Sequence, residues 1–114
     1  MPINNKTNKS ILNLTLKSAE AIPSYRFVDF SGNLASDNEK ALGTAEISYL
    51  SGEFMSIAVV GVSVVETVGA ITKGTNVASA ASGKARTASP TDNVVGRALD
   101  TCSGADFIRV LLVP

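Results

Sequence analysis

The chain has 114 residues, which suits one domain with a single buried core, so it can fold without a metal or disulfide staple. Ten basic residues balance ten acidic ones, so the chain lacks the strong positive charge that is typical of domains that bind nucleic acid or an anionic membrane. Histidine is absent and Cys102 is the single cysteine, which excludes Ser-His-Asp and Cys-His catalytic groups, an intrachain disulfide and a cysteine-rich zinc site.

The first ten residues, MPINNKTNKS, are polar and lack the apolar run of a signal peptide. We expect residues 1–10 to form an extended arm without a core of its own, followed by a single β-domain over residues 11–114. The most apolar window, residues 57–65, is too short to cross a bilayer. A soluble protein made in a reducing cytoplasm is therefore expected.

The first half of the chain predicts several strands. Residues 11–16 alternate leucine with polar side chains, which is typical of a half-buried strand. Gly61 lies inside a long run rich in β-branched residues and indicates a bulge or a sharp bend there. The further strand candidates in this half are residues 25–30, 43–50 and 53–66.

The second half continues the pattern with strand candidates at residues 75–77, 93–101 and 107–113. Turn signals arrive roughly every eight to twelve residues, as in a small sandwich or barrel. Ser36 and Glu39 have capping-box spacing, but no helical period persists for three turns. We therefore predict an all-β fold, a small β-barrel or sandwich of short antiparallel strands.

Glycines recur at nearly the same offset in the two halves. Glycine is favoured where the backbone needs a positive φ or a close approach, so we interpret these positions as structural turns. Their spacing predicts an internal two-fold repeat of turn and strand units. The matched pairs are Gly32 with Gly83, Gly43 with Gly96, and Gly52 with Gly104.

The sequence offers no recognisable catalytic, cofactor-binding or metal-binding group. Carboxylates are scattered, and no glycine-rich stretch leads from a strand into a helix in the way that phosphate binding requires. We interpret Cys102 as a small structural residue at a strand end. The prediction is a protein that is not an enzyme, needs no cofactor and acts through shape and adhesion.

A series of motifs in the second half resembles the small phage capsid cement, or decoration, proteins. The family has a "G-x-x-V" strand, a "G-K-A" hairpin, a "G-x-A-L" strand and a terminal "V-R-V-L-L"-like strand. The first half matches more loosely, and the TASPTD stretch at residues 87–92 departs from the pattern as a longer loop. The residues that carry the resemblance are Gly74 to Val77, Gly83 to Ala85, Gly96 to Leu99 and Ile108 to Leu112.

The resemblance implies a structural protein on the capsid exterior of a virion, made in the host cytoplasm and bound to the major capsid protein where capsomers meet. It implies a homo-oligomer, with a trimer favoured, and no nucleic-acid or membrane partner. The arm and one exposed edge strand are the expected contacts, since an extended segment can add to a sheet edge. The candidate capsid-contact residues are Pro2, Ile3, Asn4, Asn5 and Ile11.

Two other functional classes stay open. A different phage structural subunit, from a tail, spike or connector, would form rings or fibres by itself. A small β-fold enzyme or ligand-binding domain would need a deep polar pocket with converging carboxylates.

Overall fold

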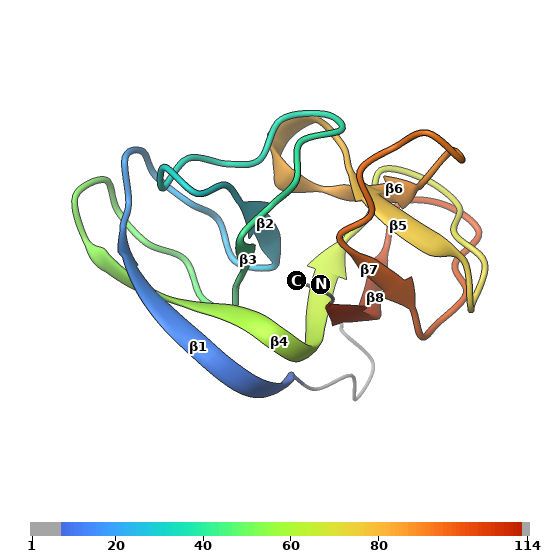
Figure 1. The fold of residues 1–114 in the computed structure, drawn as a ribbon, viewed down its shortest axis with the longest axis horizontal. Helices are drawn as coiled ribbons and strands as arrows, with labels where there is room; N and C mark the ends of the chain where they lie inside the picture. The colour runs from blue at the N-terminus through green and yellow to red at the C-terminus, as the bar shows by residue number, and fades with distance from the viewer. Residues whose placement is uncertain (1–7, 113–114) are drawn as a thin grey trace.

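The computed structural model describes residues 8–112, which fold almost entirely into short strands (Figure 1). A single 3-10 turn, η1 (Ala81–Gly83), lies between β5 and β6, and the described residues contain no α-helix. The all-β prediction is confirmed. The strands are β1 (Lys9–Lys17), β2 (Arg26–Val28), β3 (Gly43–Ala45), β4 (Phe54–Glu66), β5 (Asn76–Ser79), β6 (Ala85–Thr87), β7 (Gly96–Ala98) and β8 (Phe107–Leu112).

The strands form one antiparallel sheet in the order β2-β3-β4-β8-β7-β5-β6, with β1 paired to β4 outside this path. An isolated parallel bridge joins Thr67, directly after β4, to Ala85 in β6. This bridge brings the β6 end of the sheet back to β4. The sheet is therefore a nearly closed barrel, which removes most of its free edges.

β4 is the longest strand and is shared by both ends of the molecule (Figure 1). Its first half lies between β1 and β3, because Ala58 pairs with Asn13 on one side and with Thr44 on the other. Its second half, from Gly61 to Glu66, pairs with β8. The β-branched run of the sequence thus becomes the strand around which the other strands assemble.

Two hydrophobic clusters fill the interior, and β4 contributes to both. The larger cluster includes Ala58 and Val65, whereas the smaller one includes Met55 and Ile57. Strict alternation along a strand would put residues 58 and 65 on opposite faces. Their shared cluster therefore requires a change of phase between them, and Gly61 lies at that point.

Gly61 has a φ of +117°, and a Cβ atom there would lie 2.5 Å from the Lys9 carbonyl oxygen and 2.8 Å from the Ile11 nitrogen. The pairing of β1 with β4 is irregular nearby, between Ser10 and Leu12 and between Leu12 and Asn13. The bend or bulge predicted at Gly61 is therefore present, and it also brings β1 close to β4.

The strand ends differ from the sequence prediction in several places. The strand expected over residues 43–50 ends at Ala45, and Ile47 beyond it is exposed. The strand expected over residues 93–101 is reduced to β7. β6 carries no alternating signal that would predict it, because it is three residues long. Ser36 and Glu39 close a turn, in which the Ser36 N–H donates to the Glu39 carboxylate at 2.8 Å.

The predicted repeat has a counterpart in part of the structure. Gly43 and Gly96 each begin a three-residue strand that pairs with the next long strand, β3 with β4 and β7 with β8. Neither position has room for a side chain, since a Cβ atom would lie 2.0 Å and 2.5 Å from its nearest neighbour, respectively. The other turn positions are less uniform, because Gly32, Gly52 and Gly83 have positive φ angles whereas the φ angle of Gly104 is not positive.

Substitution of Gly61 by alanine should destabilise the domain by about 2 kcal/mol or more, because it adds backbone strain and a clash with β1. The matched control is Gly69→Ala, where a Cβ atom would meet nothing within 4 Å. Urea unfolding of the two variants measures the difference. Equal midpoints would show that the bend at residue 61 is not required.

Candidate functional site

The outer edge of β1 is an open strand edge. β1 pairs along one side with β4, and none of the other described strands pairs with it. An open edge exposes backbone N–H and C=O groups that can pair with another chain. It is the natural place on this barrel for strand addition.

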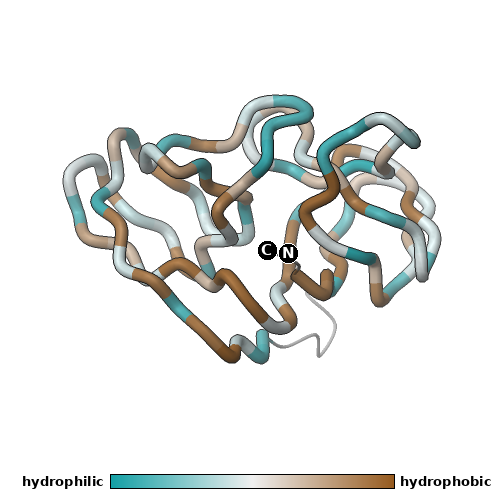
Figure 2. The backbone as a smooth tube through the Cα atoms, viewed as in Figure 1, coloured by the Kyte–Doolittle hydropathy of each residue, from teal (hydrophilic) through white to brown (hydrophobic). Residues whose placement is uncertain are grey.

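An apolar groove of about 290 Å³ lies beside β1. Leu12 and Leu14 of β1 form one wall, and both are exposed. The alternation predicts the strand correctly, but the prediction that it is half-buried is wrong, because every residue of β1 except Leu16 is exposed. Figure 2 shows hydrophobic residues along β1 and along the neighbouring part of β4. The complete lining is Leu12, Leu14, Phe30, Lys40, Ala41, Leu42, Val59 and Val60.

The start of β1 is fixed to the barrel by a side chain. The Asn8 carboxamide oxygen accepts a hydrogen bond from the Val64 N–H at 2.7 Å and another from the Ser63 hydroxyl at 3.2 Å. Ser63 is fully buried, so these bonds satisfy groups that water cannot reach. Asn8 therefore sets the point at which the N-terminal segment meets the sheet.

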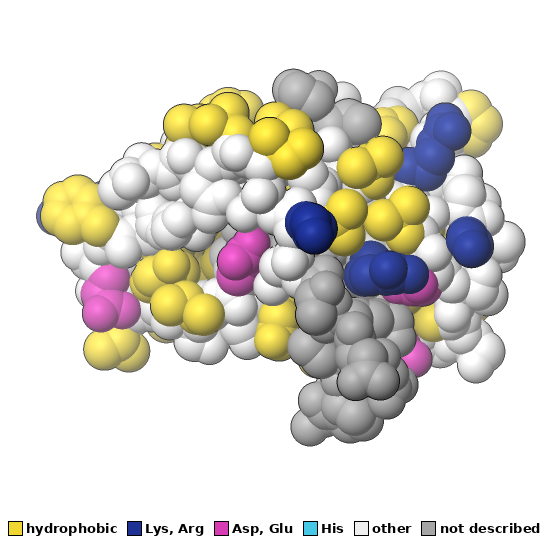
Figure 3. All heavy atoms as spheres, turned by 90° about the horizontal axis from the view of Figure 1, so that it is seen from below, with side chains coloured by type: hydrophobic (Ala, Val, Ile, Leu, Met, Phe, Trp, Pro, Cys, Tyr) yellow, Lys and Arg dark blue, Asp and Glu magenta, His cyan; other side chains and the backbone are white. Residues whose placement is uncertain are grey.

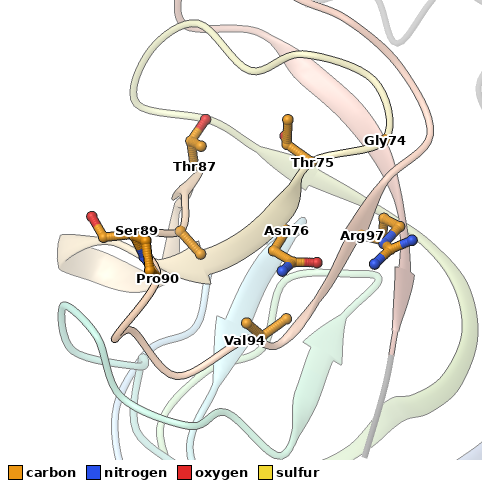
Figure 4. Close-up of a pocket in the computed structure, with 9 residues that line it drawn as sticks. Gly74, Thr75, Asn76, Thr87, Ser89, Pro90, Val94 and Arg97 are labelled. Atoms are coloured by element: carbon orange, nitrogen blue, oxygen red, sulfur yellow. The ribbon is translucent and has the colours of Figure 1, made fainter.

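A second groove, of about 500 Å³, lies between the β5–β7 pair and the loop after β6 (Figure 4). We call it the polar groove because polar side chains, which the apolar groove has only in Lys40, share its lining with apolar residues: Gly74, Thr75, Asn76, Thr87, Ala88, Ser89, Pro90, Val94 and Arg97. The loop of residues 87–92 that departs from the family pattern supplies one wall. The groove has no converging carboxylates among its lining residues.

Ion pairs hold this loop in place. The Arg86 guanidinium donates to Asp92 at 2.6 Å and to Asp37 at 2.9 Å, and the Ser89 N–H donates to Asp92 at 2.7 Å. The hydrogen bond from Arg86, together with that from Ser89, holds the pKa of Asp92 below its usual value. The same carboxylates, Asp92 first, raise the pKa of Arg86.

Lys40 connects the two grooves. Its side chain lines the apolar groove, and its ammonium group donates to the Val94 carbonyl oxygen at 2.7 Å. Burial lowers the pKa of this ammonium group. Asn38 and Asn93 add two further hydrogen bonds between the same segments, so the loop beside the polar groove is anchored to the chain segment before β3.

The described residues contain no cluster of three or more metal-ligating side chains. Cys102 is buried, and its sulfur lies 3.7 Å from the Thr67 hydroxyl and 3.4 Å from the Gly69 carbonyl oxygen, which fits a structural role. Residues 8–112 also contain no helix that could span a membrane.

The expected contact residues lie at the beginning of the chain. Ile11 is in β1, where the irregular pairing leaves its side chain 80% exposed. The strand begins at Lys9, so residues 9 and 10 of the expected arm belong to β1. The remaining candidates, Pro2, Ile3, Asn4 and Asn5, lie outside the described residues. The apolar groove beside β1 escapes sequence reasoning because Phe30 and Leu42 join it only through the fold.

Comparison with known proteins gives the family and the fold of this β-domain. The sequence profile of the phage cement protein family matches residues 6–112, which is nearly the whole chain. The chain belongs to the phage cement protein family. It is thus a structural protein of the phage virion, associated with the capsid, and the resemblance seen in the sequence motifs is confirmed.

A solved structure supports the fold. The head fiber gp8.5 N base of bacteriophage phi29 is similar to this cement protein with a TM-score of 0.76 and 15% sequence identity. The similarity covers 90% of this chain and 93% of that chain. At this identity the likeness shows a common fold. No protein in the curated set compared matches the sequence.

The Asp92 ion pair makes the loop beside the polar groove sensitive to acid. Because the folded-state pKa of Asp92 is depressed, its contribution to stability is present above the unfolded value of about 3.9 and is lost as the pH falls through the folded value. Asp92→Asn should lower the melting temperature at pH 7, and the difference from the natural sequence should disappear in strong acid.

Asp37→Asn is the matched control for this measurement. It removes the more exposed partner of Arg86, with 63% of the side chain accessible against 13% for Asp92, and should shift the melting temperature less. Melting curves from pH 2 to pH 7 give the comparison. Parallel pH profiles for Asp92→Asn and the natural protein would contradict the role given to Asp92.

Proposed function

We propose that this cement protein binds the outer surface of the phage capsid and stabilises it by clamping neighbouring copies of the major capsid protein. The observation that carries the proposal is the open edge of β1 beside an apolar groove, in a chain of the cement family. The role needs no chemical step, so the protein acts without catalysis or a cofactor. It works on the capsid exterior after synthesis in the host cytoplasm.

The contact surface that we propose combines the N-terminal arm, including Pro2, Ile3, Asn4 and Asn5, with the open edge of β1. A strand of the capsid protein can pair with this edge through backbone hydrogen bonds, while an apolar side chain enters the groove lined by Leu12 and Leu14. Main-chain pairing supplies affinity, and the groove supplies selectivity.

Weak contacts are sufficient for this role. Each bound copy favours the assembled shell over its separated subunits, because ligands that bind one state shift the equilibrium toward it. A homotrimer, which we also predict, would engage several capsid subunits at once and gain avidity without new contacts. Many copies can therefore stabilise a shell although each contact is small.

The fold likeness to a head fiber base favours a second candidate, in which this domain is the base of a longer structure on the virion. Imaging undecorated shells after they are mixed with the purified protein distinguishes the clamp from the fibre base. A clamp bridges capsid subunits by itself, whereas a fibre base needs a further chain before it has a function.

Removal of residues 1–7 should weaken binding to undecorated shells by more than about tenfold, because the arm is part of the proposed contact. The deletion keeps Asn8 and its bonds to β4, so the barrel should keep its melting temperature. Co-sedimentation with shells measures the binding. Undiminished binding by a folded deletion variant would remove the arm from the contact.

Ile11→Asp should weaken shell binding by about tenfold or more, because it places a charge in the desolvated contact while the free protein tolerates it at an exposed site. Ile47→Asp is the matched control, since Ile47 is also exposed, at 59%, but follows β3, which pairs with the edge of β4 that β1 does not occupy. Equal loss in both variants, or no loss in either, would argue against the β1 edge.

A further inference from the structure

Arg97 differs from the other arginines of the described residues. Arg26, Arg86 and Arg109 each pair with a carboxylate, at 3.0 Å, 2.6 Å and 2.8 Å for their shortest ion pairs. No carboxylate of residues 8–112 lies within ion-pair distance of Arg97, although it lines a groove of about 500 Å³. Its guanidinium group therefore faces the groove with its donors available.

Asn76 lies directly beside Arg97. The two residues are partners in the antiparallel pair of β5 and β7, so their side chains project from the same face. Figure 4 shows both side chains reaching toward the same space, with Val94 below them. Neither side chain hydrogen-bonds to another residue in the range 8–112. A guanidinium and a carboxamide together can donate to both oxygens of one carboxylate.

An apolar surface adjoins this pair of donors. A neighbouring hollow of about 370 Å³ is lined by Asn76, Val94, Gly96, Arg97 and Leu111. Leu111 of β8 is directly opposite Arg97 and is 42% exposed. Figure 3 shows basic side chains bordering apolar ones on the side of the molecule that carries β5–β8. A matching ligand therefore has an aliphatic group next to its carboxylate.

The composition of the groove limits the class of ligand. A nucleic-acid strand would need several cations along its phosphates, and the lining of the two hollows contains one, Arg97. No aromatic side chain lines either hollow, so a base or a sugar ring has nothing to stack on. A polypeptide with an acidic residue next to an aliphatic one fits all three features of the site. Its carboxylate can accept hydrogen bonds from the cation and the amide, and its aliphatic side chain can pack on the apolar surface.

The geometry points to a second binding site of this protein: the groove at Asn76 and Arg97 binds an extended polypeptide segment that places an aspartate or glutamate carboxylate on Arg97 and an aliphatic side chain on Val94 and Leu111. The site has a different lining from the apolar groove of β1, and the bond from Lys40 to the Val94 carbonyl oxygen joins the two. It does not depend on the clamp function, and it gives the virion protein a contact with an acidic partner chain.

The test is an NMR titration of the ¹⁵N-labelled full chain with the capped peptide Ac-Leu-Glu-Leu-Glu-Leu-NH₂. Saturable shifts should be confined to the Asn76 side-chain amide, the Arg97 Nε–H and the backbone of Val94 and Leu111. The peptide with glutamine in place of glutamate should not bind. Arg97→Gln should weaken binding at least tenfold, and Arg97→Lys should restore part of it, because it returns the charge without the two-pronged donor.

Lys17→Gln is the matched control, because it removes the same charge from β1 and should leave peptide binding unchanged. Equal weakening by Lys17→Gln and Arg97→Gln would reduce the effect to net charge and overturn the site. The site would also be overturned if the glutamine peptide bound, or if the shifts lay elsewhere on the barrel. Saturable binding of a thymidine oligonucleotide at Arg97, without binding of the peptide, would overturn it as well. Retained spectra of the variants outside the groove show that they are folded.

Discussion

The structure depends on the pairing of one long strand, β4, with β1 and β3 along its first half and with β8 along its second. A single strand can serve two hydrophobic clusters only if its side chains change phase between them, and the left-handed backbone of Gly61 makes that possible. The same bend places β1 against β4 on the side away from β8. The barrel closes through β4, β8, β7, β5 and β6, and β1 pairs with β4 outside this series of strands. The outer edge of β1 is therefore left open, with the apolar groove beside it.

The loops are shaped by carboxylates, and this explains how a chain of zero net charge presents an unpaired cation. Asp29 accepts from the N–H groups of Ser31 and Asn33, and Glu53 accepts from that of Leu50. Such contacts fix turns, because a short acidic side chain can replace a backbone acceptor. A carboxylate that accepts hydrogen bonds from the backbone of a turn is held there and does not pair with a distant cation. A net charge of zero for the sequence therefore does not mean that the charges cancel on each part of the surface. Arg97 lies where no such carboxylate reaches it.

Much of the fold was accessible from the sequence, and the reasons are local. Alternating leucines predict β1, and the β-branched run with Gly61 predicts β4 and its bend. The short strands are predicted less well, because three residues carry too little periodicity and β6 is defined by its pairing with β5. The candidate sites were largely inaccessible, since the Phe30 and Leu42 wall and the Asn76–Arg97 pair arise from contacts between distant segments. The motifs that marked the family are turn and strand signals, so they identify the scaffold rather than the surfaces it presents.

An open apolar edge is a hazard in a free protein, and β1 carries features that limit it. Lys9 and Lys17 stand at its two ends, and the irregular pairing around Ile11 interrupts the flat edge that a second copy would need. Lysines and bulges of this kind oppose uncontrolled strand pairing. A partner whose own edge accommodates the irregularity can still pair with β1 and fill the groove beside it. The edge can therefore remain unpaired in the free protein and still be selective for one partner.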